Sequence, residues 1–106
     1  MKKFYRSKPW IKKRGSILRR DEYRCQEAKR YGKYKEAVTV HHIYPLSEYP
    51  ELAMKEWNLI SLSNECHNSM HDRNTGKITS AGRYWQKKRE KQFKEYREQH
   101  PPLLSE

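Results

Sequence analysis

Two short segments with strand signals, the first of them β-branched, precede a short segment with helical signals in the middle of this 106-residue chain. Residues 37–43 (Ala-Val-Thr-Val-His-His-Ile) predict a strand that Pro45 ends. Residues 58–62 predict a second short strand, and residues 63–71 predict a helix capped by the serine or asparagine at its start. Only 34% of the residues are hydrophobic, so the core around these elements must be small.

The flanking segments predict mostly helix and loop. Ser7 predicts the cap of a helix over residues 8–20, and residues 21–35 predict a loop with a short strand near 23–26. Residues 47–57 predict a loop with one or two helical turns, and residues 80–99 predict a helix that Pro101 and Pro102 end. The length allows one domain, residues 1–106.

The net charge of +11 is concentrated at the two ends. Residues 1–35 hold 14 Lys and Arg against 3 Asp and Glu, whereas residues 36–71 hold one Lys and five Glu. Such basic flanks suit a nucleic acid, although a solvated surface, a ribosome-associated protein and a membrane-surface protein stay as alternatives. The candidate DNA-binding residues are Lys12, Lys13, Arg14, Arg19, Arg20 and Arg73.

Aromatic residues are interleaved with this charge and have two candidate roles, stacking on bases or covering the small core. For Trp10 we favour the core. The aromatic residues of the basic segment are Tyr5, Trp10, Tyr23, Tyr31 and Tyr34.

Four of the five histidines lie in the acidic centre. His67 and His71 are four residues apart, so on a helix both imidazoles would lie on one face and reach one metal ion. His41 and His42 are neighbours on a strand, where side chains alternate between faces. One of them can then face the metal while the other faces the substrate as a general base, since histidine titrates near neutral pH.

The chain resembles the HNH endonucleases in several motifs. The similar segments are Ser7-Lys8-Pro9-Trp10, Arg20-Asp21-Glu22-Tyr23-Arg24-Cys25-Gln26, Val40-His41-His42-Ile43-Tyr44-Pro45-Leu46, Asn58-Leu59-Ile60-Ser61-Leu62 and Cys66-His67-Asn68. The resemblance covers residues 4–73 and is greatest to small phage members. It implies an α+β fold, with a ββα-metal (His-Me finger) core at about 37–73 between an N-terminal helix and a C-terminal helix over 80–99.

The same resemblance implies the site residues and the reaction. His42 takes the general-base position, and Asn58 takes the position that orders the loop between the strands and holds the base. His41 and His67 take metal-ligand positions, and His71 falls where colicin-type members have a further metal-binding histidine. The implied reaction is DNA phosphodiester hydrolysis with one divalent ion, Zn²⁺, Ni²⁺, Mn²⁺ or Mg²⁺. Arg73 is either a phosphate clamp or a solvated charge.

Two cysteines mark a departure from the family. Many members carry two C-x-x-C pairs that bind a structural zinc, but here only Cys25 and Cys66 remain, so we expect no four-cysteine zinc. We expect the two thiols to lie near each other in a reduced, cytoplasmic protein (host cytoplasm if phage-encoded). No run of about 18 apolar residues predicts a transmembrane helix, and no apolar stretch after the first residues predicts a secretory signal.

Two other functions stay open. In a non-catalytic DNA-binding zinc module, Cys25, Cys66, His67 and His71 would form one site. In an adaptor for a phage machine, the C-terminal helix would be the contact. Phage terminase subunits are candidate partners by the family resemblance, and the sequence leaves open monomer or homodimer and nicking or double-strand cleavage.

Overall fold

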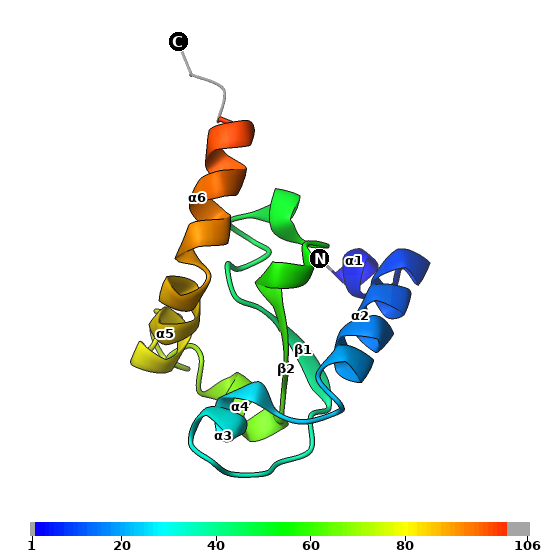
Figure 1. The fold of residues 1–106 in the computed structure, drawn as a ribbon, viewed down its shortest axis with the longest axis vertical. Helices are drawn as coiled ribbons and strands as arrows, with labels where there is room; N and C mark the ends of the chain where they lie inside the picture. The colour runs from blue at the N-terminus through cyan, green and yellow to red at the C-terminus, as the bar shows by residue number, and fades with distance from the viewer. Residues whose placement is uncertain (1, 102–106) are drawn as a thin grey trace.

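Two antiparallel strands, β1 (Thr39–His42) and β2 (Leu59–Leu62), lie at the centre of the computed structural model, which describes residues 2–101 (Figure 1). Thr39 pairs with Leu62 and His42 pairs with Leu59. The loop between the strands contains two 3₁₀ turns, η1 (Pro50–Leu52) and η2 (Glu56–Asn58), as the helical turns predicted there. The prediction of an α+β fold with strand, loop, strand and helix in this order is confirmed.

Helix α2 (Lys8–Arg20) packs against both strands and has the predicted bounds. The Ser7 side chain accepts a hydrogen bond from the backbone N–H of Trp10 and caps the helix. The buried residues of α2 are Trp10, Ile17 and Leu18. Trp10 therefore has the core position that we favoured over stacking on bases. A short helix that the sequence analysis did not predict, α1 (Lys2–Arg6), precedes α2.

The segment predicted as a loop over residues 21–35 contains a helix, α3 (Gln26–Arg30). The predicted strand near 23–26 is reduced to a single bridge between Arg24 and Glu36. The helix forms because tertiary contacts hold it: the Glu27 carboxylate accepts hydrogen bonds from the Trp85 indole at 2.8 Å and from the Arg30 guanidinium. The prediction of a loop was wrong because this polar segment finds partners far away in the chain.

Helix α4 (Asn64–Asn68) is shorter than the helix predicted over residues 63–71. Ser63 caps its start, as predicted. Its continuation is prevented because Thr79 takes the backbone carbonyls beyond it, with its hydroxyl bonded to Ser69 and its N–H bonded to Met70. His71 therefore lies outside the helix, in a bridge with Ile78.

The helix predicted over residues 80–99 is divided into α5 (Ser80–Lys88) and α6 (Glu90–Gln99). The division lies at Arg89, whose side chain donates to the Trp57 carbonyl at 3.1 Å. Figure 1 shows α6 extending away from the sheet, and no α6 residue is buried. Residue 1 and residues 102–106 of the predicted domain, Pro102 included, lie outside the described residues.

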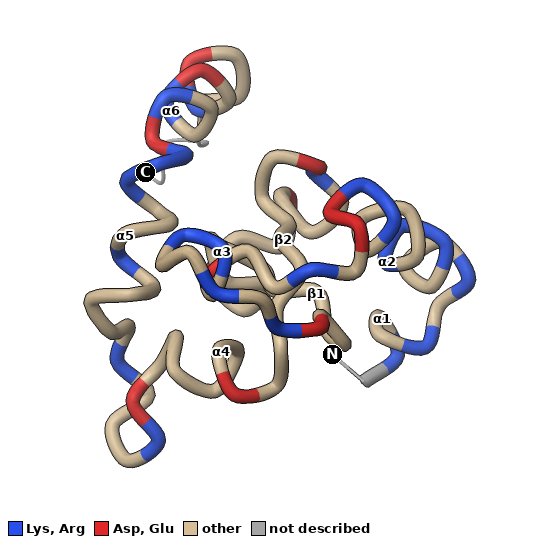
Figure 2. Tube along the Cα trace, turned by 60° about the horizontal axis from the view of Figure 1, so that its bottom comes forward, with Lys and Arg blue, Asp and Glu red and all other residues tan. Residues whose placement is uncertain are grey.

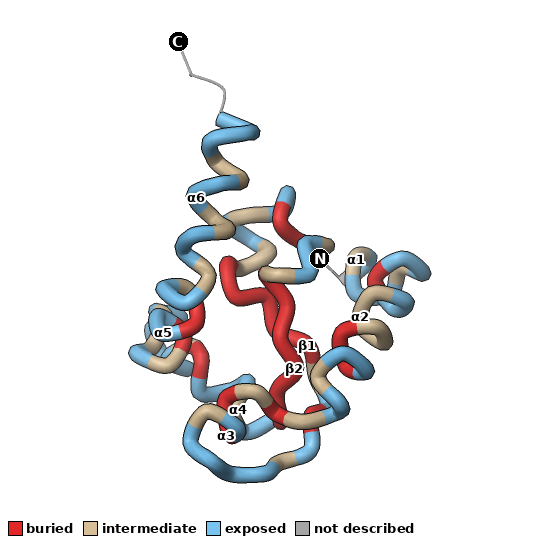
Figure 3. The backbone as a smooth tube through the Cα atoms, in the orientation of Figure 1, coloured by how far each residue is buried: buried red, intermediate tan, exposed pale blue. Residues whose placement is uncertain are grey.

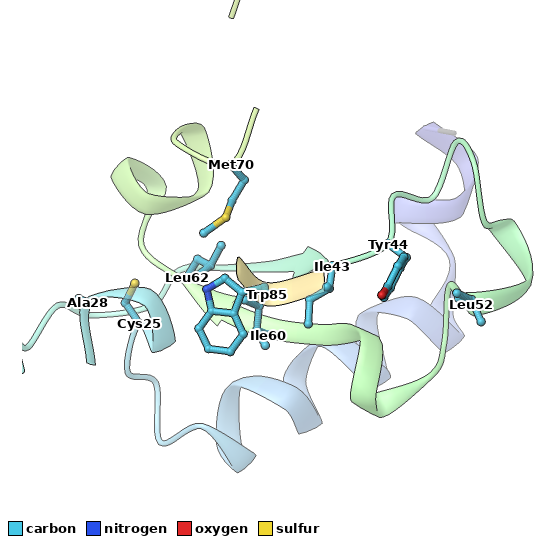
Figure 4. Close-up of a cluster of buried hydrophobic side chains, with 9 residues drawn as sticks. All are labelled: Cys25, Ala28, Ile43, Tyr44, Leu52, Ile60, Leu62, Met70 and Trp85. Carbon is cyan, nitrogen blue, oxygen red and sulfur yellow. The ribbon is translucent and has the colours of Figure 1, made fainter. Parts of the chain in front are cut away.

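Buried residues form two clusters around the strands (Figure 3). One joins α2 to the strands through Trp10, Ile17 and Leu59. Figure 4 shows the other, in which side chains from α3, the strands and α5 meet. Its members are Cys25, Ala28, Ile43, Tyr44, Leu52, Ile60, Leu62, Met70 and Trp85. Within residues 2–101, none of the helices combines the length and the apolar composition that a membrane crossing requires.

Candidate active site

His41 and His42 end strand β1 and have different neighbours, as their alternation on a strand predicts. The ring centroid of His41 lies 5.4 Å from that of His67 and 6.2 Å from that of His71. The His42 ring instead stacks on Trp10, with centroids 5.0 Å apart. Both histidines are only 6% exposed, so the strand holds two imidazoles in the interior beside one surface opening.

His67 and His71 reach His41 from different parts of the backbone. His67 lies on α4 and His71 lies in the bridge beyond it, so the predicted shared helical face does not exist. The structure nevertheless places both rings beside His41. Three of the four predicted imidazoles therefore form one cluster.

Two imidazoles of this cluster, those of His41 and His67, have lowered pKa values that favour their neutral form. Burial, together with repulsion from His67, His71 and His42, lowers the pKa of His41 to about 3. Desolvation lowers the pKa of His67 as well, with a further contribution from His71. Neutral imidazole nitrogens are the form in which histidine binds metal ions.

The three rings stand farther apart than the ligands of one metal ion. Within residues 2–101, no three His, Cys, Asp or Glu side chains stand close enough to grip one ion without adjustment. Imidazoles that share a tetrahedral ion, with nitrogens about 2.0–2.1 Å from it, have centroids about 5 Å apart. The His41–His67 separation is close to this value and the His41–His71 separation exceeds it. The donor set therefore suits a divalent ion, and ligation requires the His71 ring to move inward.

One nitrogen of His42 is already engaged. Its Nε2 lies 3.0 Å from the backbone carbonyl of Ala53, and a carbonyl only accepts, so Nε2 carries the proton. Burial lowers the pKa of His42, although the Ala53 carbonyl opposes this shift, so the ring is neutral near pH 7. The other nitrogen, Nδ1, then has a free lone pair and can accept a proton.

Asn58 lies under the loop that carries Ala53 and is fully buried. Its Oδ1 accepts from the Tyr44 N–H at 2.7 Å, and its Nδ2 donates to the carbonyls of Tyr44 and Leu52 at 3.2 Å each. Leu52 directly precedes Ala53, so Asn58 fixes the loop whose carbonyl holds His42. It does so through hydrogen bonds to backbone groups of Tyr44 and Leu52.

A cavity of about 290 Å³ opens beside these histidines. All four of them line it, together with Tyr5 of α1. The His42 ring and the cluster of His41, His67 and His71 therefore share one cavity. Sequence reasoning did not assign Tyr5 to the site, and its signal was its place among basic residues. The other lining residues that it did not assign are Thr39, Val40, Pro45, Leu46 and Ser47.

The predicted DNA-binding residues fall into two groups. Lys13 pairs with Glu56 at 3.3 Å, and Arg14 donates to the Val38 carbonyl at 2.7 Å. The Arg20 guanidinium holds Asp21 and the carbonyls of Glu56 and Leu59. The other predicted residues, Lys12, Arg19 and Arg73, are exposed.

Figure 2 shows that Lys and Arg nonetheless run along α1 and α2. The basic face of these helices is therefore partly a structural scaffold and partly free charge.

The two cysteines belong to the apolar core rather than to the group of rings around His41. Cys25 is fully buried in the apolar cluster with Met70 and Trp85, and Cys66 packs against that cluster. His67 and His71 have His41 as their common neighbour instead. This arrangement does not favour a Cys₂His₂ zinc module.

Known proteins resemble this chain in both sequence and structure. The sequence model of the HNH endonuclease family matches residues 24–73. One similar protein is the HNH endonuclease of deep-sea thermophilic bacteriophage GVE2, known from a crystal structure with manganese ion. Its sequence is 37% identical to this chain, and the two structures match with a TM-score of 0.62. That similarity covers 63% of this chain and 73% of the phage protein, whereas no curated protein matches. The chain therefore belongs to the HNH endonuclease family.

Proposed function

We propose that this protein is a metal-dependent DNA endonuclease in which His42 is the general base for phosphodiester hydrolysis. The observation that carries this role is the hydrogen bond of His42 Nε2 to the Ala53 carbonyl. It holds the proton on Nε2 and leaves Nδ1 as the basic nitrogen of a residue that lines the same cavity as the other three histidines.

His41, His67 and His71 would hold one divalent ion through neutral imidazole nitrogens. When bound, the ion supplies a Lewis acid that stabilises negative charge on the phosphate and on the leaving oxygen. Imidazole donors suit Zn²⁺, Ni²⁺ and Mn²⁺ better than Mg²⁺. The related phage endonuclease was crystallised with manganese, so Mn²⁺ is the first ion to test here.

The chain's own groups divide the proton chemistry between them. His42 Nδ1 takes a proton from a water molecule as its oxygen attacks phosphorus and the bond to the 3′ oxygen breaks. The Ala53 carbonyl stabilises the resulting imidazolium through Nε2–H. Trp10, stacked on the ring, and Asn58, beneath the loop, hold this orientation, so both act as positioning residues.

DNA binding is proposed for the exposed basic residues Lys12, Arg19 and Arg73. Phosphate contacts release counterions and carry little sequence information, so affinity should depend strongly on salt. Lys13, Arg14 and Arg20 already have partners within the fold, which makes structural support their main role.

Substitution of His42 tests the proposal. His42→Ala should lower kcat by about 10²- to 10⁴-fold, the contribution typical of a general base, while retaining binding of DNA and Mn²⁺. His100→Ala, which removes an exposed histidine on α6's C-terminal side, is the matched control and should cleave normally. Full cleavage by His42→Ala, in a preparation free of host nucleases, would overturn the assignment. If the protein is instead a non-catalytic zinc module, neither substitution should change cleavage, DNA binding or metal binding much.

The ligand assignment has a separate readout. His41→Ala should abolish Mn²⁺ binding in calorimetry, whereas His42→Ala should not. Binding that survives His41→Ala unchanged would place the ion elsewhere.

We also propose that one chain cuts one strand, since it carries one such site. Supercoiled plasmid should then give the relaxed form before the linear form across a panel of divalent ions. A role beside the phage terminase rests on the resemblance to phage HNH proteins. Copurification with terminase subunits, and its loss when exposed α6 side chains are changed, would test that role.

A further inference from the structure

The cavity at the proposed active site has one wall that does not come from the ββα core. Tyr5 belongs to α1, before the residues matched by the family model. It lines the cavity together with His42 and the three clustered histidines. A residue from the N-terminal segment therefore lies where the phosphodiester must enter.

The Tyr5 ring is held in place by aromatic contacts on several sides. It packs edge-on against Phe4 with centroids 5.3 Å apart, against Trp10 at 5.8 Å and against His42 at 6.2 Å. Helix α1 is tied to α2 because the Ser7 hydroxyl donates to the Phe4 carbonyl at 2.7 Å. The ring is thus fixed relative to the proposed general base, yet Tyr5 is 45% exposed.

The chemistry of a tyrosine hydroxyl in this position suits a donor. Burial raises the pKa of Tyr5 above its ordinary value, so the hydroxyl stays protonated near neutral pH and can donate a hydrogen bond. The group that reaches the histidines in hydrolysis is a phosphodiester, whose oxygens are charged acceptors. Lys3 and Arg6, exposed on the same helix, add positive charge at this wall.

We propose that Tyr5 is a further substrate-binding residue, whose hydroxyl donates a hydrogen bond to a phosphate oxygen of the DNA backbone in the cavity. This inference rests on the proposed nuclease function. It assigns α1 to the active site, in addition to the strands and α4, and predicts that contact depends on the hydroxyl rather than on the ring.

The test compares Tyr5→Phe, which removes only the hydroxyl, with Tyr84→Phe. Tyr84 is an exposed tyrosine that does not line the cavity. With Mn²⁺ and a plasmid substrate, Tyr5→Phe should lower kcat/KM by about 10- to 100-fold, the loss expected for one hydrogen bond to a charged group, and Tyr84→Phe should have no effect. A kcat/KM for Tyr5→Phe within twofold of the unsubstituted protein would overturn the proposal.

Two further measurements separate the ring from the hydroxyl and the inference from the proposed function. If Tyr5→Phe is normal and only Tyr5→Ala is impaired, the ring is the active part and the hydrogen-bond proposal is wrong. DNA affinity measured by fluorescence anisotropy without metal should also fall about tenfold in Tyr5→Phe. That readout decides the role of Tyr5 even if the unsubstituted protein fails to cleave, which would refute the nuclease function alone.

Discussion

Replacing Asn58 with Ala should destabilise the fold and loosen the proposed general base together. The substitution removes three hydrogen bonds from a fully buried side chain. The Leu52 carbonyl keeps a second donor, the Lys55 N–H. Tyr44 loses the partner of its N–H and of its carbonyl among the described residues, and both groups stay buried.

The magnitude follows from these losses. Each hydrogen bond contributes about 1 kcal/mol net, and a buried group left without a partner costs about 1–3 kcal/mol. The free energy of unfolding should therefore fall by about 3 kcal/mol, a large share of the roughly 5–15 kcal/mol of an ordinary domain. At about 4–8 °C per kcal/mol, Tm should fall by more than about 10 °C.

The same substitution should affect catalysis below that Tm. Because Leu52 is followed by Ala53, movement of the loop shifts the carbonyl that holds His42. We expect kcat to fall about tenfold or more, a loss of about 1.4 kcal/mol in the transition state, while KM for DNA changes little.

Urea denaturation followed by tryptophan fluorescence, together with cleavage kinetics at a temperature where both proteins are folded, measures the two effects. Asn74→Ala is the control, since Asn74 is exposed and its turn uses its backbone N–H. Surface substitutions usually change the free energy of unfolding by less than about 0.5 kcal/mol. If Asn58→Ala changes it by no more than this, the structural reasoning is wrong. If it is destabilised but keeps full kcat, the link to His42 is wrong.

Three other perturbations have expected outcomes. With a chelator present, the free energy of unfolding should fall as pH drops from about 6.5 toward 3, by up to about 1.4 kcal/mol per pH unit. The reason is that the pKa of His41 is about 3 in the folded protein, so the unfolded chain binds more protons in this pH range. A free energy of unfolding that stays constant in urea melts over this range would contradict the prediction. Glu27→Gln should lower the free energy of unfolding by about 2 kcal/mol, since Arg30 loses its ionic partner, as calorimetry can check. Arg20→Ala should lower the free energy of unfolding by about 1 kcal/mol, because it removes hydrogen bonds to two backbone carbonyls. Arg19→Ala should instead reduce by about 1 the slope of the logarithm of DNA affinity against the logarithm of salt concentration. If the two variants behave alike in both measurements, the division of these arginines into a structural and a DNA-binding one is wrong.

The elements that sequence reasoning predicted well are those set by local chemistry. Helix α2 begins after its Ser7 cap and has its apolar stripe on one face, so its bounds follow from neighbours in sequence. Strand β1 follows in the same way from the β-branched residues at its start, and β2 from its short apolar run. The different neighbours of His41 and His42 required only the alternation of side chains along β1.

The elements that were missed depend on distant partners. Helix α3 is stabilised through Glu27, whose partner Trp85 is 58 positions away. Arg89 divides the last helical segment where it reaches the Trp57 carbonyl. Helix α1 packs its aromatic residues around a histidine of β1. None of these contacts leaves a periodic pattern in the local sequence.

For a related reason, the sequence did not separate the predicted DNA-binding residues that have partners within the fold from those that do not. A guanidinium on an amphipathic helix has the same sequence signature whether it binds phosphate or a backbone carbonyl. Arg14 and Arg20 satisfy carbonyls of the two strand regions, so they join α2 to the sheet.

The prediction about His71 shows the reverse case. The helical spacing that suggested it is absent, but the bridge to Ile78 brings its ring to the same cluster. The position of this proposed ligand is therefore set by the tertiary contact of Thr79 with Met70, not by the helix repeat. An i, i+4 pattern of histidines occurs in many helices that bind no metal. The proposal of a metal site rests instead on His41, which comes from a separate strand and lies beside both rings.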